Sequence, residues 1–277
     1  MSFESGIRNS FSLDKIIGEG NVDSAGNVGK GRHLFDDLKN AGKIYLSDSW
    51  HIYSAPGRLT RTDVLWLAGI ISVGGTIYTY DRDIYNAFKR NQNHALYKPI
   101  RQLGDNIEKI GHMGITGKYF FGALVTGYIF DIKPMTRISS QIIEAFFITG
   151  GVKNVATIAI GRTRPHEGNG PEYFRFNEDG TSFPSGHSIN VLEIADILSH
   201  NIDYRPFQIS CYGLASVVCL QRITSDSHWP SDVYFSAIFG WVVSHELQKR
   251  HQGRKREITI VPFINEESTG LKISINI

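Results

Sequence analysis

Three short segments of the chain concentrate residues that can bind and cleave phosphate esters. The first is residues 161–165 (GRTRP), the second is residues 183–188 (FPSGHS), and the third runs from Arg222 through His228 to Asp232. Guanidinium groups match phosphate oxygens in a bidentate manner, and an imidazole can act as a nucleophile or as a proton donor. Together, the segments indicate a phosphate site with its own nucleophile and its own acid.

The first two segments carry groups suited to holding an anion. Arg164 precedes a proline, which disfavours the helical conformation at Arg164 and places its guanidinium at a helix end. Ser185 and Gly186 come just before an apolar stretch that predicts a helix from about Ser188. Free backbone N–H groups and the positive end of the helix dipole gather at such a point, and Gly186 lets an anion approach the backbone. This end of the helix is therefore expected to face the phosphate.

The third segment places a histidine beside a carboxylate. Pro230 suits the first position of a helix, so His228 is expected just before that helix and Asp232 in its first turn. We expect the Asp232 carboxylate to accept a hydrogen bond from one ring nitrogen of His228. That bond would fix the tautomer and leave the other ring nitrogen free to attack phosphorus.

The three segments resemble the signature of the type 2 phosphatidic acid phosphatase superfamily, which also includes bacterial non-specific acid phosphatases and vanadium haloperoxidases. The resemblance covers residues 61–250 in motif order and in helical character. It implies that His228 attacks phosphorus and forms a phosphohistidine, with Asp232 orienting His228. It also implies that His187 protonates the leaving alkoxide and later activates water. The groups implied to hold the phosphoryl oxygens are Arg164, Arg222, the Ser185 side chain and the Gly186 amide.

Two positions depart from the family pattern. The family usually has a lysine seven residues before Arg164, where this chain has Thr157. Lys153 lies one helical turn earlier on the same face and can reach forward, and Arg162 is a second possible substitute. Without compensation, the loss of one charge-assisted donor would cost about 2 to 4 kcal/mol of transition-state stabilisation. The other departure is Gln221, where the family usually has serine before the arginine.

The remaining pattern predicts a mainly α fold, a helical bundle of the phosphatase/haloperoxidase type. We divide the chain into a Gly-rich N-terminal extension (residues 1–60, with a short helix near 34–39), a helical phosphatase domain (61–250) and a tail with a β hairpin (251–277). The expected helices after a first one from Arg61 are residues 83–90, 96–128, 139–161, 188–199, 207–222 and 231–250.

Three apolar runs bear on membrane contact: residues 64–80, 119–130 and 233–244. They are shorter than the roughly 20 residues that a spanning helix needs, so we expect buried helices in a soluble or peripherally attached protein. The N-terminus lacks the apolar stretch of a signal peptide. The family tendency favours an extracytoplasmic location, periplasmic or membrane-associated. A net charge of +2 argues against nucleic acid as a partner.

The sequence thus predicts a metal-independent phosphatase that acts on a phosphorylated lipid or a small phosphomonoester, with no cofactor. Two alternatives stay open. One is a vanadium-dependent haloperoxidase, which would need vanadate, and the other is a non-catalytic phosphate- or lipid-binding relative. The other histidines considered, at positions 94, 112, 245 and 251, show no metal-ligand spacing and are expected to be structural or solvated. The natural substrate, the compartment and the oligomeric state are left open.

Overall fold

The computed structural model describes residues 30–95, 97–176, 181–255, 258–265 and 268–275. The chain divides into two compact units, Met1–Tyr53 and Ser54–Ile277. The described part of the first unit is helix α2 (Lys30–Tyr53). It is much longer than the short helix expected near residues 34–39. No proline interrupts the chain before Pro56, and the two glycines, Gly31 and Gly42, are tolerated within the helix.

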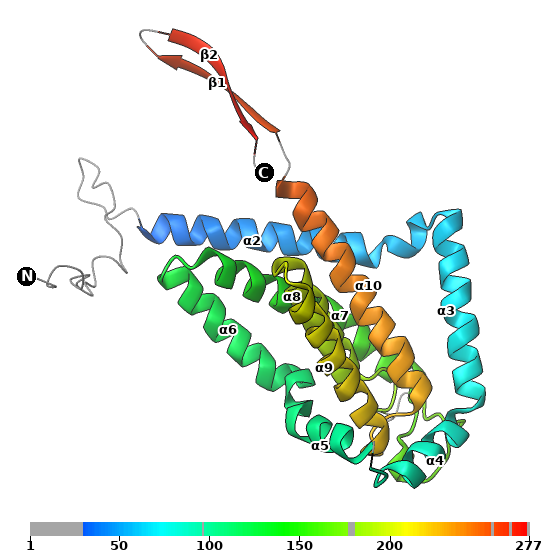
Figure 1. Cartoon of the computed structure of the whole chain (residues 1–277). Coiled ribbons are helices and arrows are strands. Elements are labelled where there is room, and N and C mark those ends of the chain that lie inside the picture. The colour runs from blue at the N-terminus through cyan, green and yellow to red at the C-terminus, as the bar shows by residue number, and fades with distance from the viewer. Residues whose placement is uncertain (1–29, 96, 177–180, 256–257, 266–267, 276–277) are drawn as a thin grey trace, which may run out of the picture. The chain divides into compact units, whose positions relative to one another are not determined.

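The second unit is mainly α, as predicted (Figure 1). After the short 3₁₀ turn η1 (Ala55–Arg58), its helices are α3 (Arg61–Thr79), α4 (Asp81–Asn91), α5 (Tyr97–Ile107), α6 (Met113–Ile129), α7 (Lys133–Ile160), α8 (Gly186–Asn201), α9 (Arg205–Thr224) and α10 (Pro230–Lys255). Two further 3₁₀ turns are η2 (Glu108–Gly111) and η3 (Pro165–Glu167). Strands β1 (Ile258–Asn265) and β2 (Ser268–Ile275) pair antiparallel, with Ile258 opposite Ile275.

Helix α8 is the centre of the bundle. It packs against α7, α9 and α10, and most of its residues are buried (Figure 1). The backbones of α8 and α10 approach closely, because a Cβ atom on Gly240 would lie 2.4 Å from the carbonyl oxygen of Ile189. The N-terminal end of α8 carries the Ser185-Gly186-His187 segment, and the N-terminal end of α10 follows His228. The packing of these two helices therefore sets the relative position of the two histidines.

The stretch expected as one helix over residues 96–128 is broken in the structure. Helix α5 ends at Ile107, the turn η2 follows, and α6 begins at Met113. The break allows η2 to pack on the start of α8, where a Cβ atom on Gly111 would lie 3.0 Å from the Cα atom of His187. The prediction of a continuous helix was wrong, and the turn that replaces it brings residues 108–112 to the predicted site.

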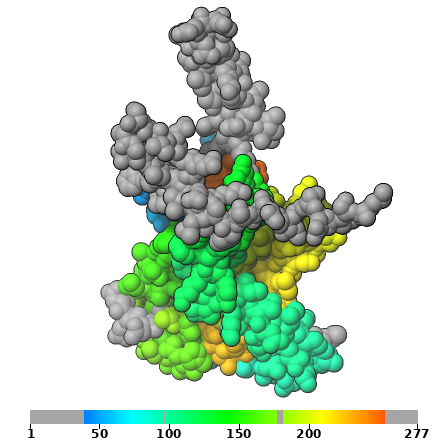
Figure 2. Space-filling model, turned by 90° about the vertical axis from the view of Figure 1, so that its left-hand side faces the viewer, coloured from blue at the N-terminus to red at the C-terminus, as the bar shows by residue number. Residues whose placement is uncertain are grey.

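Two of the three apolar runs are not buried as expected. Leu65 and Trp66 in α3 are 73% and 72% exposed, and Tyr119 in α6 is 76% exposed. The α6 surface runs over the centre of the face that Figure 2 shows. Apolar residues around a whole helix indicate a non-aqueous surrounding, but this pattern alone does not tell a protein core from lipid. The third run, residues 233–244 in α10, is mostly buried or half-buried.

By length and composition, one helix of the described chain could cross a membrane. This helix is α7, and a third of its most apolar stretch is buried within the protein.

Candidate active site

The three predicted segments converge on one cavity of about 670 Å³. Its lining includes both predicted histidines, His187 and His228, together with Arg164, Gly186 and Lys153. These residues come from the loop after α7, the start of α8, the loop before α10, and the body of α7 itself. None of the described residues that line the cavity is Asp or Glu. The hollow therefore presents cations and imidazoles, a combination suited to an anion.

His228 is held by a backbone carbonyl. Its Nδ1 atom lies 2.5 Å from the carbonyl oxygen of Ser182, so Nδ1 carries the proton and donates it. The side chain is almost fully buried. Burial lowers the pKa of His228 well below its usual value, and the positive charge of Arg164 lowers it further. The ring is therefore neutral, and its Nε2 lone pair is available for attack.

Asp232 does not orient His228 by a direct hydrogen bond, which corrects the sequence prediction. Its Oδ2 atom accepts from the Ser182 hydroxyl at 2.5 Å and from the backbone N–H of Trp229 at 3.1 Å. Its Oδ1 atom accepts from the Arg162 guanidinium at 2.6 Å. The carboxylate is thus occupied by these donors, and it acts on His228 only through Ser182, whose hydroxyl it binds and whose carbonyl holds the ring.

Arg162 is also not a phosphate ligand, contrary to the possibility raised from the sequence. Its guanidinium is 3% exposed and lies 2.6 Å from a carboxylate oxygen of Asp81 and 2.6 Å from one of Asp232. Its Nε atom donates to the carbonyl oxygen of Pro171. Burial alone lowers the pKa of Arg162, but Asp232 and Asp81 together raise it above its usual value. Arg162 lies in the loop after α7 and therefore links this loop to α4 and to α10 through ion pairs. Its side chain does not line the cavity.

His187 lies at the first turn of α8 among several cations. Burial lowers its pKa most, and the neighbouring Arg222, His112, Arg164 and Lys153 lower it further, to about 3. Its Nε2 atom lies 3.8 Å from the Glu108 carboxylate. In the empty cavity the ring is neutral, and it would gain a proton most readily when an anion offsets the surrounding positive charge.

Arg222 lies near both histidines but is not among the residues that line the cavity. Its Nε atom donates to the Gln221 side-chain oxygen at 2.7 Å, and one of its terminal nitrogens lies 2.5 Å from the Glu108 carboxylate. Gln221 is held in turn by a hydrogen bond of 2.9 Å to Asp105 of α5. Gln221, which replaces the usual serine, therefore positions Arg222. Glu108 accepts a hydrogen bond from the same Arg222 guanidinium.

Ser185 is the N-cap of α8 and not a free phosphate donor. Its Oγ atom accepts from the backbone N–H of Ser188 at 3.4 Å, and its own N–H donates to the Ser236 hydroxyl at 2.7 Å. Ser185 is fully buried and does not line the cavity. Gly186 does line it, so of these two predicted phosphate contacts only Gly186 faces the cavity.

Lys153 supplies a cation to the cavity in a chain that lacks the usual family lysine at position 157. Its Cε atom lies 2.9 Å from the position that a Cβ atom on Gly186 would take. Thr157, one turn along α7, lines the same cavity. Burial lowers the pKa of Lys153, and the nearby Arg164 lowers it further. Within the described residues, neither Lys153 nor Arg164 has a carboxylate within ion-pair distance, so both can meet an anion.

Sequence reasoning missed three residues of this site. His112, which was expected to be structural or solvated, lines the cavity. Glu108 pairs with Arg222 and lies near His187, and it reaches them only because the α5–α6 helix is broken at η2. Gly111 followed by His112 was the signal for that break. Ser182 acts through its carbonyl and its hydroxyl, and a backbone carbonyl leaves no signal in the residue type.

Comparison with known families agrees with this geometry. Residues 140–256 match the model of the PAP2 superfamily. This is the type 2 phosphatidic acid phosphatase superfamily, so the family resemblance is confirmed over that segment. The matched PAP2 segment contains all three sequence motifs, Lys153, and helices α8 and α9. The helices before residue 140, which supply Glu108 and Asp81, lie outside it.

One curated relative is similar to a part of the chain. A stretch of 101 residues is 30% identical to a protein named Lipid A 1-phosphatase from Porphyromonas gingivalis. The match covers 35% of this chain and 20% of that protein. The chain therefore spans only a small part of the relative's length. No solved structure matches the chain.

Proposed function

We propose that the protein is a phosphatase that hydrolyses phosphate monoesters through a phosphohistidine on His228. The observation that supports this most directly is the cavity lined by His228, His187, Arg164 and Lys153 with no described carboxylate. A phosphate dianion placed there meets two cations and a neutral imidazole nucleophile. The phosphoryl charge is then met by side chains of the protein, and the reaction proceeds without a metal or other cofactor.

The proposed reaction has two steps. His228 Nε2 forms a bond to phosphorus while the bond from phosphorus to the ester oxygen breaks, and His187 gives its proton to the departing alkoxide. A water molecule then attacks the phosphohistidine and passes a proton to His187, and His228 is released together with phosphate. Substrate binding prepares His187 for the first step, because the dianion raises the His187 pKa from its value of about 3 in the empty cavity.

A phosphorylated lipid is the substrate class that we propose. The matched relative is named for a lipid phosphate, and the chain carries exposed apolar helix faces close in sequence to the site. Phe147 and Val155 of α7 are 68% and 69% exposed, and Lys153 belongs to the same helix. An apolar surface beside a polar cavity allows acyl chains to stay in lipid while the headgroup enters.

Membrane association follows from the same surfaces and is part of this proposal. Several large apolar residues of α3 and α6 are exposed, and exposed apolar patches mark protein or membrane interaction sites. Lipid contact removes this apolar area from water and stabilises the protein by about 25 cal/mol per Å². An extracytoplasmic location stays a prediction from the family tendency.

The test is a comparison of substrates and variants of the full chain in detergent micelles. Phosphatidate and a phosphorylated glycolipid are compared with p-nitrophenyl phosphate, and H228A is compared with wild type. We expect faster turnover of the lipids, no turnover by H228A, inhibition by vanadate, and a base-stable, acid-labile phosphoryl-enzyme in wild type. Turnover by H228A at the wild-type rate would remove His228 as the nucleophile.

Other outcomes would support the open alternatives. Halide oxidation after the addition of vanadate would favour a haloperoxidase. Binding of phosphate without turnover of any substrate would favour a non-catalytic relative. Faster turnover of p-nitrophenyl phosphate than of every lipid would contradict the substrate class while leaving the phosphatase reaction in place.

A further inference from the structure

A second cluster of ionisable side chains lies at the opposite end of α8 from the candidate active site. It consists of Asp196 and His200 on α8 and His245 on α10. Asp196 is ten residues beyond Gly186, which is about 15 Å along a helix. One possible metal-ligating atom from each of the three side chains lies within 4.8 Å of the other two. This cluster plays no part in the phosphatase chemistry described above.

The Asp196 carboxylate is buried with little compensation. The residue is fully buried, and its Oδ1 atom accepts one hydrogen bond, from the Tyr212 hydroxyl at 2.8 Å. Its Oδ2 atom has no hydrogen-bond partner, and neither does the buried Nδ1 atom of His245. No described lysine or arginine pairs with it. A buried carboxylate without a compensating charge is costly, so binding of a cation here would stabilise the folded protein.

The His245 nitrogen and the Asp196 carboxylate oxygen are spaced like two ligands of one metal ion. The Nδ1 atom of His200 donates to the backbone carbonyl oxygen of Asp196 at 2.9 Å, so its Nε2 atom is the one left to bind an ion. The Nδ1 atom of His245 lies 3.7 Å from Asp196 Oδ1, beyond the normal N–H···O range of about 2.7 to 3.2 Å. Adjacent ligand atoms around a tetrahedral zinc ion, with bonds of about 2.0 to 2.1 Å, lie about 3.3 to 3.4 Å apart. The separation between His245 Nδ1 and Asp196 Oδ1 is therefore close to that of a loaded site. The hydrogen bond from His200 Nδ1 to a backbone carbonyl is the usual arrangement for a histidine that binds a metal through Nε2.

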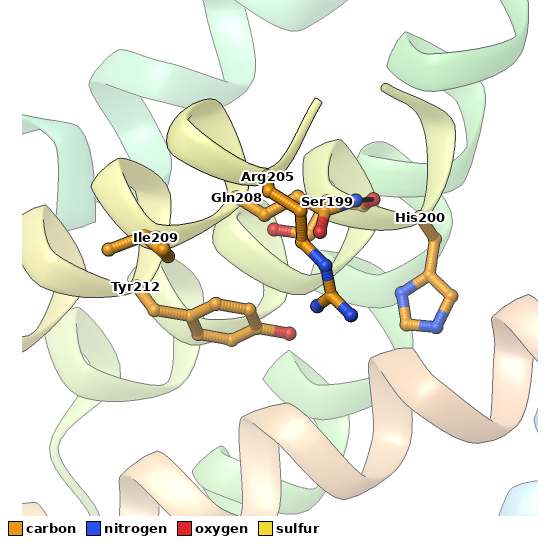
Figure 3. Close-up of a pocket in the computed structure, with 6 residues that line it drawn as sticks. All are labelled: Ser199, His200, Arg205, Gln208, Ile209 and Tyr212. Atoms are coloured by element: carbon orange, nitrogen blue, oxygen red, sulfur yellow. Dashed lines mark hydrogen bonds between the residues drawn. The ribbon is translucent and has the colours of Figure 1, made fainter. Parts of the chain in front are cut away.

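We infer that Asp196, His200 and His245 bind a divalent transition metal ion, with zinc as the best match. Two imidazoles and one carboxylate are a common zinc ligand set and leave a fourth position for water. Tyr212 orients the carboxylate as an outer-shell donor. A cavity of about 490 Å³ gives the ion a path from solvent, and its lining includes both His200 and Tyr212 (Figure 3).

The site would join the two helices that position the catalytic histidines. Asp196 and His200 are on α8, whose first turn carries His187, and His245 is on α10, which begins just after His228. Coordination of the ion would link α8 and α10 at a point far from the candidate active site. It would therefore stabilise the fold without entering the chemistry.

The sequence signal for this cluster was present but was not recognised. Asp196 and His200 are four residues apart, a spacing that puts both side chains on one helix face. His245 was expected to be structural or solvated because it shows no metal-ligand spacing in the sequence. Only the packing of α10 on α8 brings the third ligand into place.

The experiment measures metal binding by the full chain after treatment with EDTA and dialysis. Zn²⁺ and Co²⁺ are titrated by calorimetry, and the visible spectrum of the Co²⁺ form reports tetrahedral geometry. We expect one ion per chain and a higher melting temperature in the presence of Zn²⁺. H200A and H245A should weaken binding by at least about 100-fold, and Y212F by about 10-fold, in line with the typical effect of an outer-shell change.

Three controls keep the inference testable. H94A replaces an exposed histidine outside the cluster, and H228A replaces an active-site histidine; both should bind Zn²⁺ like wild type. Circular dichroism confirms that each variant is folded. Failure of wild type to bind either ion would overturn the inference. Binding of Zn²⁺ by H200A and H245A as tightly as by wild type would also overturn it. Loss of binding in H228A alone would place the ion in the active site and would also overturn it.

Discussion

The Nδ1 atom of His228 lies 2.5 Å from the carbonyl oxygen of Ser182, and the hydroxyl of the same serine lies 2.5 Å from Asp232. The proposed nucleophile is thus oriented by the backbone of the loop before α8, and the Asp232 carboxylate acts on it only through Ser182. Because Ser182 directly precedes the Phe183–Ser188 segment, a shift in this loop would move both histidines together. This coupling allows several substitutions to be predicted.

Asp232→Asn tests the indirect role of the carboxylate. In a serine protease triad, where the carboxylate contacts the histidine directly, the same change lowers kcat by about 10⁴. Here the Ser182 carbonyl still holds the ring, so we expect kcat to fall by about 10- to 100-fold and KM to change little. Steady-state kinetics on folded protein measure this. A loss as large as that of H228A would mean that Asp232 contacts the ring during turnover.

Arg162 and Arg164 are two residues apart but should respond differently to replacement by alanine. Arg162→Ala leaves the buried carboxylates of Asp81 and Asp232 unpaired, so the free energy of unfolding should fall by about 3 to 5 kcal/mol. Arg164→Ala removes a cation without a described carboxylate partner, so stability should change little while kcat/KM falls by at least about 100-fold. Urea unfolding and kinetics separate the two effects. The reverse result would contradict the assignment of both arginines.

Lys153→Met tests whether this lysine replaces the one missing at Thr157. We expect kcat/KM to fall by about 100- to 1,000-fold, the usual effect of removing one donor to a developing charge. The double variant K153M/T157K restores a lysine one turn along α7 on the same cavity wall, and it should recover part of the loss.

The control for this pair is T157K alone. It should not impair folding, because Thr157 lines the cavity and leaves room for a longer side chain. If K153M is as active as wild type, then Lys153 does not meet the phosphate. In that case the chain works without the family lysine or any substitute for it.

Much of this site could be predicted from the sequence, because its chemistry is local. The Arg-Pro and Pro-Ser-Gly-His segments and the histidine before Pro230 each predict a helix end, and helix ends gather at one cavity. Long-range packing decided the rest. Asp232 could reach His228 by sequence spacing, but buried Arg162 and the Ser182 hydroxyl bind its oxygens instead.

The exposed apolar helices show the same limit at the level of the fold. Residues 64–80 and 119–130 were expected to be buried because their apolar character resembles that of a core helix. Their exposure in α3 and α6 depends on how few elements pack on them, which no local pattern contains.

Glu193 gives a prediction whose sign depends on pH. It is fully buried on α8, and burial raises its pKa well above 4.5, an effect that the nearby Thr149 only partly offsets. In the unfolded chain the carboxyl ionises near pH 4.5, whereas in the folded protein it keeps its proton. Between these two pKa values the folded state binds more protons, so this group makes the protein less stable as the pH rises.

Glu193→Gln removes this titration while keeping the size of the side chain. The variant's stability minus that of wild type should therefore increase from pH 4.5 to pH 8, by up to about 1.4 kcal/mol per pH unit. His228, whose folded pKa is lowered, has the opposite trend, but it is present in both proteins and cancels in the difference. Urea unfolding at several pH values measures it, with E172Q as a control for the loss of an exposed charge. A difference that is flat or falls with pH would show that Glu193 is ionised in the folded protein.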